Sequence, residues 1–227
     1  MGILLRNATP ADVPAILRLE EACYPTLALV AHWNAALLAN HQRRFPEGQF
    51  VAEHQGEVVG HSACFVTRSE LVLRPHTFGE ATARGTFDTH DPHGDTLYGA
   101  EIMVHPDHRR LGVGKRFYEA RLALAGRLGL RYFVAGGRIP GYLELAGRLT
   151  PEEYVRQVVA GEREDRVLTP QLRSGLRVAE VMSGYLNDPN SGGYATLLVW
   201  ENPRAVSARR PSSSAPAAAR RKNPSPG

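Results

Sequence analysis

The chain has 227 residues, of which 43% are hydrophobic and 22% are charged, enough to bury one sizeable core or two small ones. This composition excludes collagen-like, disordered and coiled-coil proteins. The formal net charge of +4 suggests an acidic partner, but six of the 27 basic residues and none of the 23 acidic residues lie in residues 203–227. Residues 1–202 therefore carry a small excess of acidic side chains.

Helical and strand patterns alternate along residues 1–202. Thr9, Pro10 and Asp12 mark a helix start, because they supply a capping hydroxyl, an N-terminal proline and an acid in the first turn. Two β-rich runs joined at Gln55-Gly56 predict an antiparallel hairpin over 49–67. Residues 68–95 are irregular, which is typical of a binding loop or a mobile lid. We further expect strands at 3–9, 96–105, 131–137, 176–182 and 194–200, and helices at 10–24, 30–44, 112–128, 142–148 and 151–161.

These elements predict a single mixed α/β domain over 1–202, built around one sheet. Residues 203–227 are rich in Pro, Ser, Ala and Arg, so we expect a disordered basic tail there, with binding to nucleic acid or an anionic surface as the alternative. Cys23 and Cys64 cannot form a disulfide framework. Since the sequence shows neither a signal peptide nor a membrane-length apolar run, we expect a cytoplasmic protein.

A strand, turn and helix at 101–117 carry the sharpest motif, EIMVHPDHRRLGVGKRF. The pattern R-x-x-G-x-G precedes an amphipathic helix, and the first N–H groups of a helix bind phosphate well. Gly112 and Gly114 let a ligand approach the backbone, and Arg109, Arg110 and Lys115 add positive charge. The motif therefore predicts capture of a phosphorylated ligand, although it fits neither a dinucleotide fingerprint nor a P-loop.

This motif, with the strand ending Val104-His105-Pro106 and the helix beginning Lys115-Arg116-Phe117, resembles that of the GNAT superfamily of N-acetyltransferases. The resemblance implies a mostly antiparallel central sheet flanked by helices and acetyl-CoA as cosubstrate. It also implies that the pyrophosphate lies on the amides of 110–114 and that the pantetheine pairs with backbone at the splayed end of the preceding strand. The candidate cofactor-binding residues are Met103, Val104, Arg109, Arg110, Leu111, Gly112, Val113, Gly114 and Lys115.

A narrower resemblance links LYGAEIMVHPDHRRLGVG, AGGRIPGY and ATLLVWENP to the acetyltransferase half of bacterial proteins that fuse this domain to a carbon-nitrogen hydrolase. No hydrolase half is expected in these 227 residues, and no amidase nucleophile is inferred.

Glu101 is the candidate general base, because apolar neighbours on its strand should raise its pKa, and the acetyltransferases it resembles often hold an acid there. A structural ion pair with an arginine is the competing interpretation. The general acid is harder to assign, because Gln171 stands where the family often has a tyrosine and glutamine cannot protonate a thiolate. We name Tyr142 as the candidate, with Tyr154 or water as alternatives and plain packing as the competing role of either tyrosine.

Three further features leave alternatives open. Arg138 after a strand end would orient a substrate carboxylate or remain a surface cation. The acids and histidines at 88–95 suggest metal but are explained by a polar turn, so we expect no metal site. Cys64 lies in an apolar run and should be core rather than a nucleophile.

The sequence thus predicts an acetyl-CoA-dependent N-acetyltransferase that uses direct attack by a primary amine in a ternary complex. The alternative is an acyl-CoA-binding module with little turnover, motivated by Gln171. The partners we expect are acetyl-CoA and an amine, small or on a protein, without a membrane and without nucleic acid. Homodimerisation is compatible with the sequence, but no feature specifies it.

Overall fold

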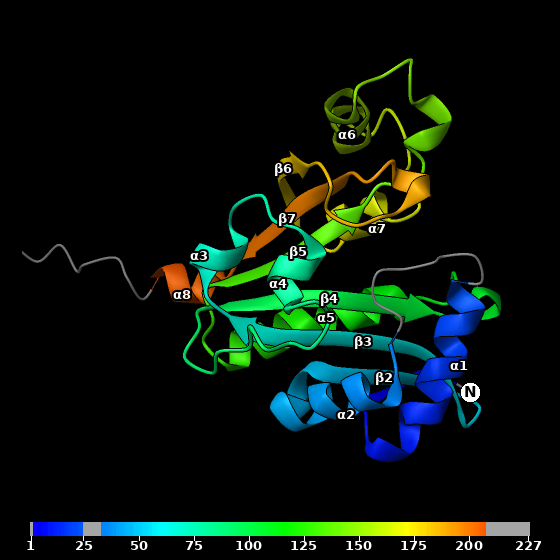
Figure 1. The fold of residues 1–227 in the computed structure, drawn as a ribbon, viewed down its shortest axis with the longest axis vertical. Helices are drawn as coiled ribbons and strands as arrows, with labels where there is room; N and C mark the ends of the chain where they lie inside the picture. Colours follow the sequence, from blue (N-terminus) through cyan, green and yellow to red (C-terminus); the bar gives the residue numbers. More distant parts are fainter. Residues whose placement is uncertain (1, 25–32, 208–227) are drawn as a thin grey trace, which may run out of the picture.

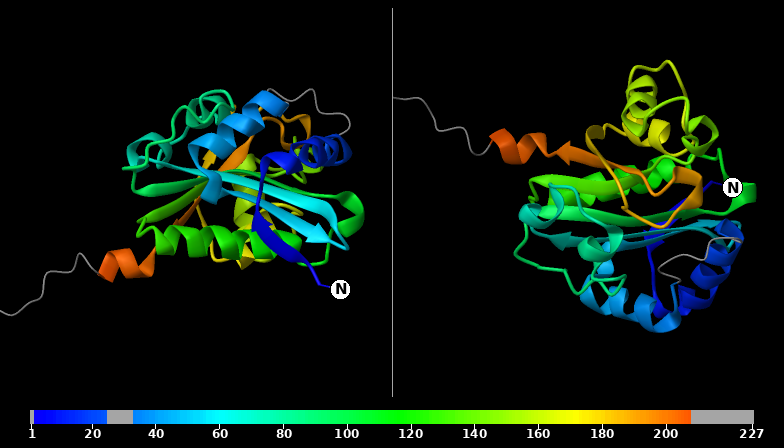
Figure 2. Two further views of the ribbon diagram at one scale, coloured as in Figure 1. Left: turned by 90° about the horizontal axis from the view of Figure 1, so that it is seen from below. Right: turned by 45° about the horizontal axis from the view of Figure 1, so that its top comes forward.

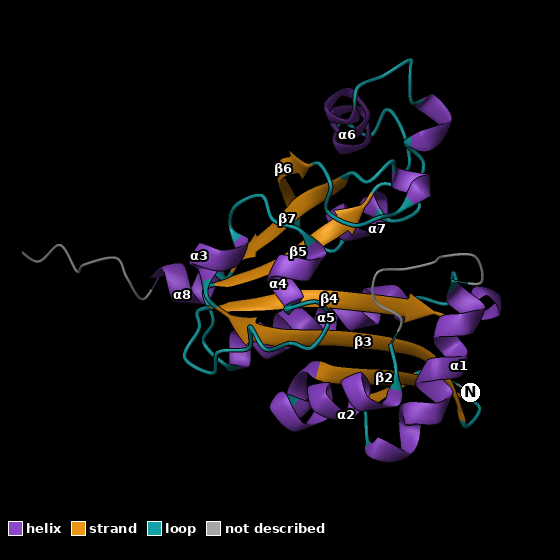
Figure 3. Ribbon diagram, in the orientation of Figure 1, coloured by secondary structure: helices purple, strands orange, loops and turns teal. Residues whose placement is uncertain are grey.

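The computed structural model describes residues 2–24 and 33–207, which form a seven-stranded sheet in the order β1-β2-β3-β4-β5-β7-β6 with helices on both sides (Figures 1 and 3). Neighbouring strands are antiparallel except β4 and β5, which are parallel. The predicted fold class is confirmed. The strands are β1 (Leu4–Asn7), β2 (Gln49–His54), β3 (Glu57–Thr67), β4 (Thr96–Val104), β5 (Tyr132–Arg138), β6 (Arg177–Met182) and β7 (Ala195–Glu201). The α-helices are α1 (Val13–Cys23), α2 (Ala35–Arg44), α3 (Ser69–Val72), α4 (Phe78–Thr82), α5 (Val113–Arg127), α6 (Pro151–Val159), α7 (Leu168–Arg173) and α8 (Pro203–Ser207).

Local sequence signals account for several of these boundaries. Asp12 accepts hydrogen bonds from the backbone N–H and the hydroxyl of Thr9, which closes the predicted capping box ahead of α1. The hairpin of β2 and β3 turns at Gln55 and Gly56, as predicted, and both residues have positive φ. These signals act over a few residues, so the sequence alone locates them.

The helices cover the two faces of the sheet. Figure 2 shows α1 and α2 on one face and α5 on the other. Phe117 of α5 packs so closely under β3 that a Cβ at Gly60 would lie 2.9 Å from its ring. Val113, Phe117 and Leu124 form an apolar stripe along this helix and are almost fully buried.

β4 and β5 pair at only one end and then diverge (Figure 1). Their register runs from Thr96 opposite Tyr132 to Gly99 opposite Ala135, although β4 continues to Val104 and β5 to Arg138. A bulge in β4 accompanies the divergence, because Gly99 pairs with Cys64 and Glu101 with Ala63, which leaves Ala100 as the extra residue. The backbone of β4 beyond Gly99 therefore lacks a partner strand on its β5 side.

Several segments differ from the sequence-based expectation. The predicted helix at 142–148 is only a 3₁₀ turn, Leu143–Leu145. The stretch 68–95 contains α3 and α4, and α4 begins with a capping box of Thr77 and Glu80. α7 was missed because six residues are too few for a helical period. α8 covers the first five residues of the predicted tail, whose remainder lies outside the described residues.

The predicted helix at 30–44 starts at Ala35, where the Asn34 side chain caps it, and residues 30–32 lie outside the described part of the chain. Within residues 2–24 and 33–207, no helix is both long and apolar enough to span a bilayer.

Candidate active site

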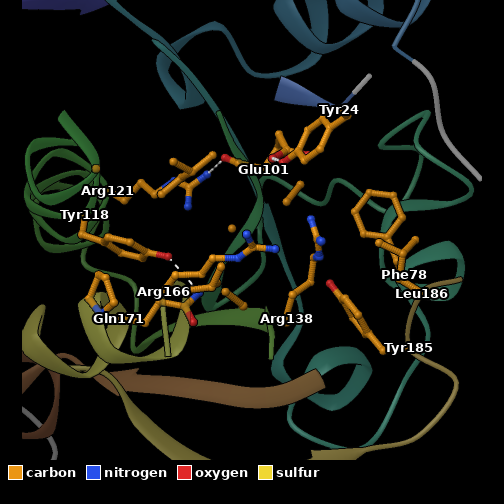
Figure 4. Close-up of a pocket in the computed structure, with 18 of the residues that line it drawn as sticks. Tyr24, Phe78, Glu101, Tyr118, Arg121, Arg138, Arg166, Gln171, Tyr185 and Leu186 are labelled. Atoms are coloured by element: carbon orange, nitrogen blue, oxygen red, sulfur yellow. Dashed lines mark hydrogen bonds between the residues drawn. The ribbon is translucent and has the colours of Figure 1, made fainter. Parts of the chain in front are cut away.

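A cavity of about 300 Å³ lies where β4 and β5 diverge (Figure 4). Its walls come from elements on both faces of the sheet, so the cavity passes between the two strands. Tyr24 after α1, Phe78 of α4 and Tyr185 between β6 and β7 line one part. The other part is lined by residues of α5 and α7, namely Gly114, Tyr118, Arg121, Pro170 and Gln171.

Glu101 directs its carboxylate into this cavity, and the hydroxyl of Tyr24 donates a hydrogen bond to its Oε1 at 3.1 Å. Burial raises the pKa of Glu101, although the Tyr24 hydrogen bond and the charges of Arg138 and Arg121 oppose the rise. The nearby arginines make no ion pair with Glu101. The carboxylate is therefore available to a ligand.

Arg121 of α5 is a buried cation beneath β4, with only 1% of the residue exposed. Its Nη2 donates to the carbonyl oxygens of Ala63 and Glu101, and its Nε has no partner. Burial lowers the pKa of Arg121, partly offset by Cys64, Tyr118 and Glu101. Because no described acid forms an ion pair with it, Arg121 contributes positive potential to the cavity wall.

Tyr118 and Gln171 meet in the same wall. The Nε2 of Gln171 donates to the hydroxyl oxygen of Tyr118 at 3.0 Å, so the phenolic proton remains free to be donated elsewhere. Burial raises the pKa of Tyr118, with the Arg121 charge and the Gln171 hydrogen bond opposing. The phenol is therefore protonated at neutral pH. Both hydroxyl and amide point into the cavity in Figure 4.

Arg138 ends β5 and is fixed by Asp188, whose Oδ2 accepts from Nε at 2.7 Å. Burial works against the charged form, but the Asp188 hydrogen bond and charge leave the pKa of Arg138 raised overall. The guanidinium lies 5.8 Å from the centre of the Tyr24 ring. Arg166, from the segment before α7, also extends into the cavity.

The turn into α5 offers unpaired backbone donors. None of the N–H groups of residues 110–115 donates to another described residue, and the first backbone hydrogen bond of the helix is from Arg116 to Gly112. Arg110 and Gly112 both have positive φ, and a Cβ on Gly112 or Gly114 would meet nothing within 4 Å. These amides fit an anionic group such as a pyrophosphate. Gly114 lines the cavity, so the turn and Glu101 belong to one site.

The remaining predicted cofactor residues surround this turn. Met103 and Val104 lie on the stretch of β4 that pairs with β3 but not with β5, and the Val104 carbonyl accepts from Nε of Arg109 at 3.3 Å. Leu111 is 51% exposed, whereas Val113 is buried against the sheet. Lys115 is exposed and pairs with Glu119 at 3.6 Å.

The predicted proton donor, Tyr142, is not brought to the cavity. Its hydroxyl donates to the Leu149 carbonyl at 3.3 Å, and its ring contacts Tyr154 and Tyr194. Tyr154 donates to Asp165 at 2.7 Å and does not line the cavity either. Both tyrosines pack within the α6 region.

The other predicted features fall outside the cavity. Asp88 pairs with Arg44 and Asp91 with Arg68, and no three metal-ligating side chains gather among the described residues. Cys64 is fully buried, as predicted.

Sequence reasoning missed Tyr118 and Arg121 as site residues. Arg121 carried a readable signal, because it lies four residues after Phe117 and three before Leu124, inside the apolar stripe of α5. A charged residue at such a position needs a specific partner or ligand. The distance in sequence between Tyr118 and Gln171 left no comparable signal for their hydrogen bond.

Comparison with known proteins agrees with this geometry. Residues 13–138 match the model of the acetyltransferase (GNAT) family. The chain is 38% identical over 201 residues to the probable hydrolase YhcX of Bacillus subtilis, covering 88% of this chain and 39% of that protein. It is 34% identical to the uncharacterized N-acetyltransferase YkwB of the same organism, covering 88% and 89% of the two chains.

Among solved structures, the GNAT-like decarboxylase GphF in complex with isobutyryl-CoA is 27% identical, with a TM-score of 0.73 over 87% of this chain and 98% of that one. The match to YhcX over part of its length agrees with the predicted similarity to one half of a fusion protein. The family match indicates a CoA thioester as cosubstrate. The chain belongs to the GNAT family of acetyltransferases.

Proposed function

We propose that the protein is an N-acetyltransferase that moves the acetyl group of acetyl-CoA to a primary amine by direct attack in a ternary complex. The observation that carries the proposal is the single cavity that joins the α5 N-terminus to the carboxylate of Glu101 between the diverging strands. The pyrophosphate would bind the free amides of 110–114, and the thioester would lie between Tyr118 and Glu101.

Glu101 is the proposed base. An amine attacks only when its nitrogen lone pair is free, so the ammonium must lose a proton, directly or through water, to the carboxylate. A raised pKa makes Glu101 a better proton acceptor than an ordinary glutamate. As the C–N bond forms and the C–S bond breaks, the electron pair leaves with sulfur. The first proton stays on Glu101, and the amide nitrogen releases its second proton to solvent water.

Tyr118 is the proposed acid in place of Tyr142. The departing thiolate needs a proton, and the free phenolic O–H of Tyr118 supplies it while Gln171 holds the oxygen in position. The positive charge of Arg121 stabilises the resulting phenolate and the developing negative charge on the thioester. Gln171 thus supports the reaction without donating the proton itself.

The test is thiol release from acetyl-CoA with a panel of primary amines, together with calorimetric binding of CoA. We expect submillimolar CoA binding and amine-dependent thiol release. Binding without release would favour the acyl-CoA-binding module, and absence of binding would overturn the proposal.

Glu101→Gln tests the base specifically. We expect kcat/KM to fall about 10²- to 10⁴-fold. In the wild type the rate should decrease toward acid pH because Glu101 becomes protonated, and this decrease should be absent from the pH–rate profile of the variant. Glu180→Gln, an exposed glutamate of β6, is the matched control and should keep the wild-type profile. A full rate for Glu101→Gln at every pH would remove the proposed base.

A second candidate function is decarboxylation of a carboxylated acyl-CoA, favoured by the structural likeness to the GNAT-like decarboxylase. In that reaction the C–C bond to the carboxylate breaks, carbon dioxide leaves, and the electron pair passes to the thioester enolate, which Arg121 would stabilise before protonation. Malonyl-CoA with mass-spectrometric detection of acetyl-CoA tests this candidate, and unchanged malonyl-CoA would exclude it.

A further inference from the structure

The part of the cavity around Glu101 and Arg138, where the amine acceptor would bind, carries both negative and positive side chains. Glu101 presents a carboxylate that accepts a hydrogen bond from Tyr24 and makes no ion pair with a described residue. Arg138 presents a guanidinium whose Nε is held by Asp188, while its two Nη atoms have no hydrogen-bond partner among the described residues. Both side chains adjoin Tyr24, whose hydroxyl donates to Glu101 and whose ring centre lies 5.8 Å from the guanidinium of Arg138.

The surroundings of Arg138 position its guanidinium to bind a ligand, unlike those of a solvated surface cation. Asp188 has only 1% of its side chain exposed, and it also accepts from the hydroxyl of Ser191 at 2.5 Å. Asp188 therefore fixes the guanidinium through one nitrogen and leaves its outer edge open. That edge carries paired N–H donors in the geometry that binds a carboxylate.

Arg166 adds a second cation at the same place. Figure 4 shows its side chain reaching into the cavity beside Arg138, and it makes no ion pair with a described residue. With Asp188 committed to Arg138, the cavity keeps an excess of positive charge over Glu101, to which Arg121 also contributes. A dicationic or polyamine acceptor would be repelled there, and an acceptor that brings its own anion would be favoured.

We propose that the amine acceptor is a small amino acid-like molecule, whose amine binds beside Glu101 and whose carboxylate binds the open edge of Arg138, assisted by Arg166. This inference rests on the proposed function and adds the substrate class. It separates this site from acetyltransferases that act on simple amines, because the carboxylate is a required recognition element.

The experiment compares matched acceptors that differ only in the carboxylate: glycine with glycinamide, β-alanine with β-alaninamide, and γ-aminobutyrate with its amide. Thiol release and the mass of the product are measured with acetyl-CoA. In at least one pair, kcat/KM for the acid should exceed that for the amide by about ten- to a hundredfold, since a hydrogen bond to a charged group is lost in the amide. Equal or better use of the amides would overturn the inference.

Variants assign the preference to the arginines. Arg138→Gln should abolish the preference for the acid while Arg138→Lys keeps part of it, and Arg166→Gln should reduce it. Arg166 is exposed and unpaired, so its variant tests the inference even if loss of the Asp188 ion pair unfolds Arg138→Gln. Arg131→Gln, at the other end of β5 and paired with Glu201, is the control and should leave the preference unchanged. A preference that persists in both Arg138→Gln and Arg166→Gln would contradict the assignment.

A binding measurement separates this inference from the proposed function. Free CoA forms a dead-end complex in which calorimetry compares glycine, β-alanine and γ-aminobutyrate with their amides. Acid-selective binding without turnover would uphold the substrate class and overturn acetyl transfer. Equal turnover of acids and amides would uphold acetyl transfer and overturn the substrate class. If the protein neither binds nor acetylates these molecules, both the substrate class and acetyl transfer are overturned.

Discussion

His41 and His61 are each only 1% exposed, so protonating either ring places a charge in the core. Burial, the main cause for both, lowers the pKa of His41 to about 4 and that of His61 to about 3, from an ordinary value of 6.5. The Nε2 of His41 is bonded to the Gly85 carbonyl at 2.7 Å, while Nδ1 of His61 has no partner. The unfolded chain therefore binds protons near pH 6 that the folded chain does not.

Stability should consequently fall as the pH falls through 6.5 toward 4. Linkage gives a loss of about 2 kcal/mol for each histidine between pH 7 and pH 5, or about 4 kcal/mol together. This is a large part of the 5–15 kcal/mol of a typical domain. Glu101 acts in the opposite direction, because its pKa is raised in the folded state, and it reduces the net loss.

Urea unfolding followed by circular dichroism at pH 7 and pH 5 measures this loss. His61→Met, a similar volume without a titrating group, should reduce the pH 7 to 5 difference by about 2 kcal/mol, whatever its stability at pH 7. Comparing differences removes the contribution of Glu101, which both proteins share. If His61→Met loses as much stability on acidification as the wild type, the argument from burial is refuted. The measured stability at acid pH also sets the lowest pH at which the protein stays folded, and therefore the lowest pH at which the pH–rate profile can report the protonation of Glu101.

Three further substitutions test the site and the packing beside it. Tyr118→Phe should lower kcat about 10²-fold or more with little change in CoA affinity, and an unchanged kcat would exclude Tyr118 as the acid. The same substitution should lower the free energy of unfolding by about 1–3 kcal/mol, because Gln171 loses its hydrogen-bond acceptor. Gly114→Leu should keep the melting temperature, because its Cβ meets nothing within 4 Å, yet weaken CoA binding by about tenfold or more in calorimetry, and equal affinity would contradict the cofactor placement. Gly136→Ala should cost about 1–3 kcal/mol in urea unfolding, because its Cβ would lie 2.0 Å from the Tyr185 ring, and unchanged stability would refute that packing.

The parts of the fold that sequence predicts are those with local causes. The turn at Gly112, the hairpin at Gln55 and the capping box at Thr9 each depend on residues within a few positions of one another. The bulge at Ala100 has no such cause. It follows from the pairing of β4 with β3, and it decides where Glu101 points relative to its strand neighbours. The apolar neighbours of Glu101 and the family resemblance could therefore identify it as a candidate, but alternation along β4 could not give its orientation.

The role of Gln171 shows what depends on tertiary contacts. By residue type, a glutamine at this position argues for a lost acid, and Tyr142 and Tyr154 are the replacements that the sequence offers. In the folded chain α7 packs against α5, so Gln171 donates to Tyr118, 53 positions earlier. Under our proposal, the proton donor and the amides that hold the pyrophosphate then belong to one helix. The 15-residue α5, with Phe117 and Leu124 anchored in the core, keeps the two at a constant separation, so cofactor binding places the sulfur relative to its acid without any movement of α7.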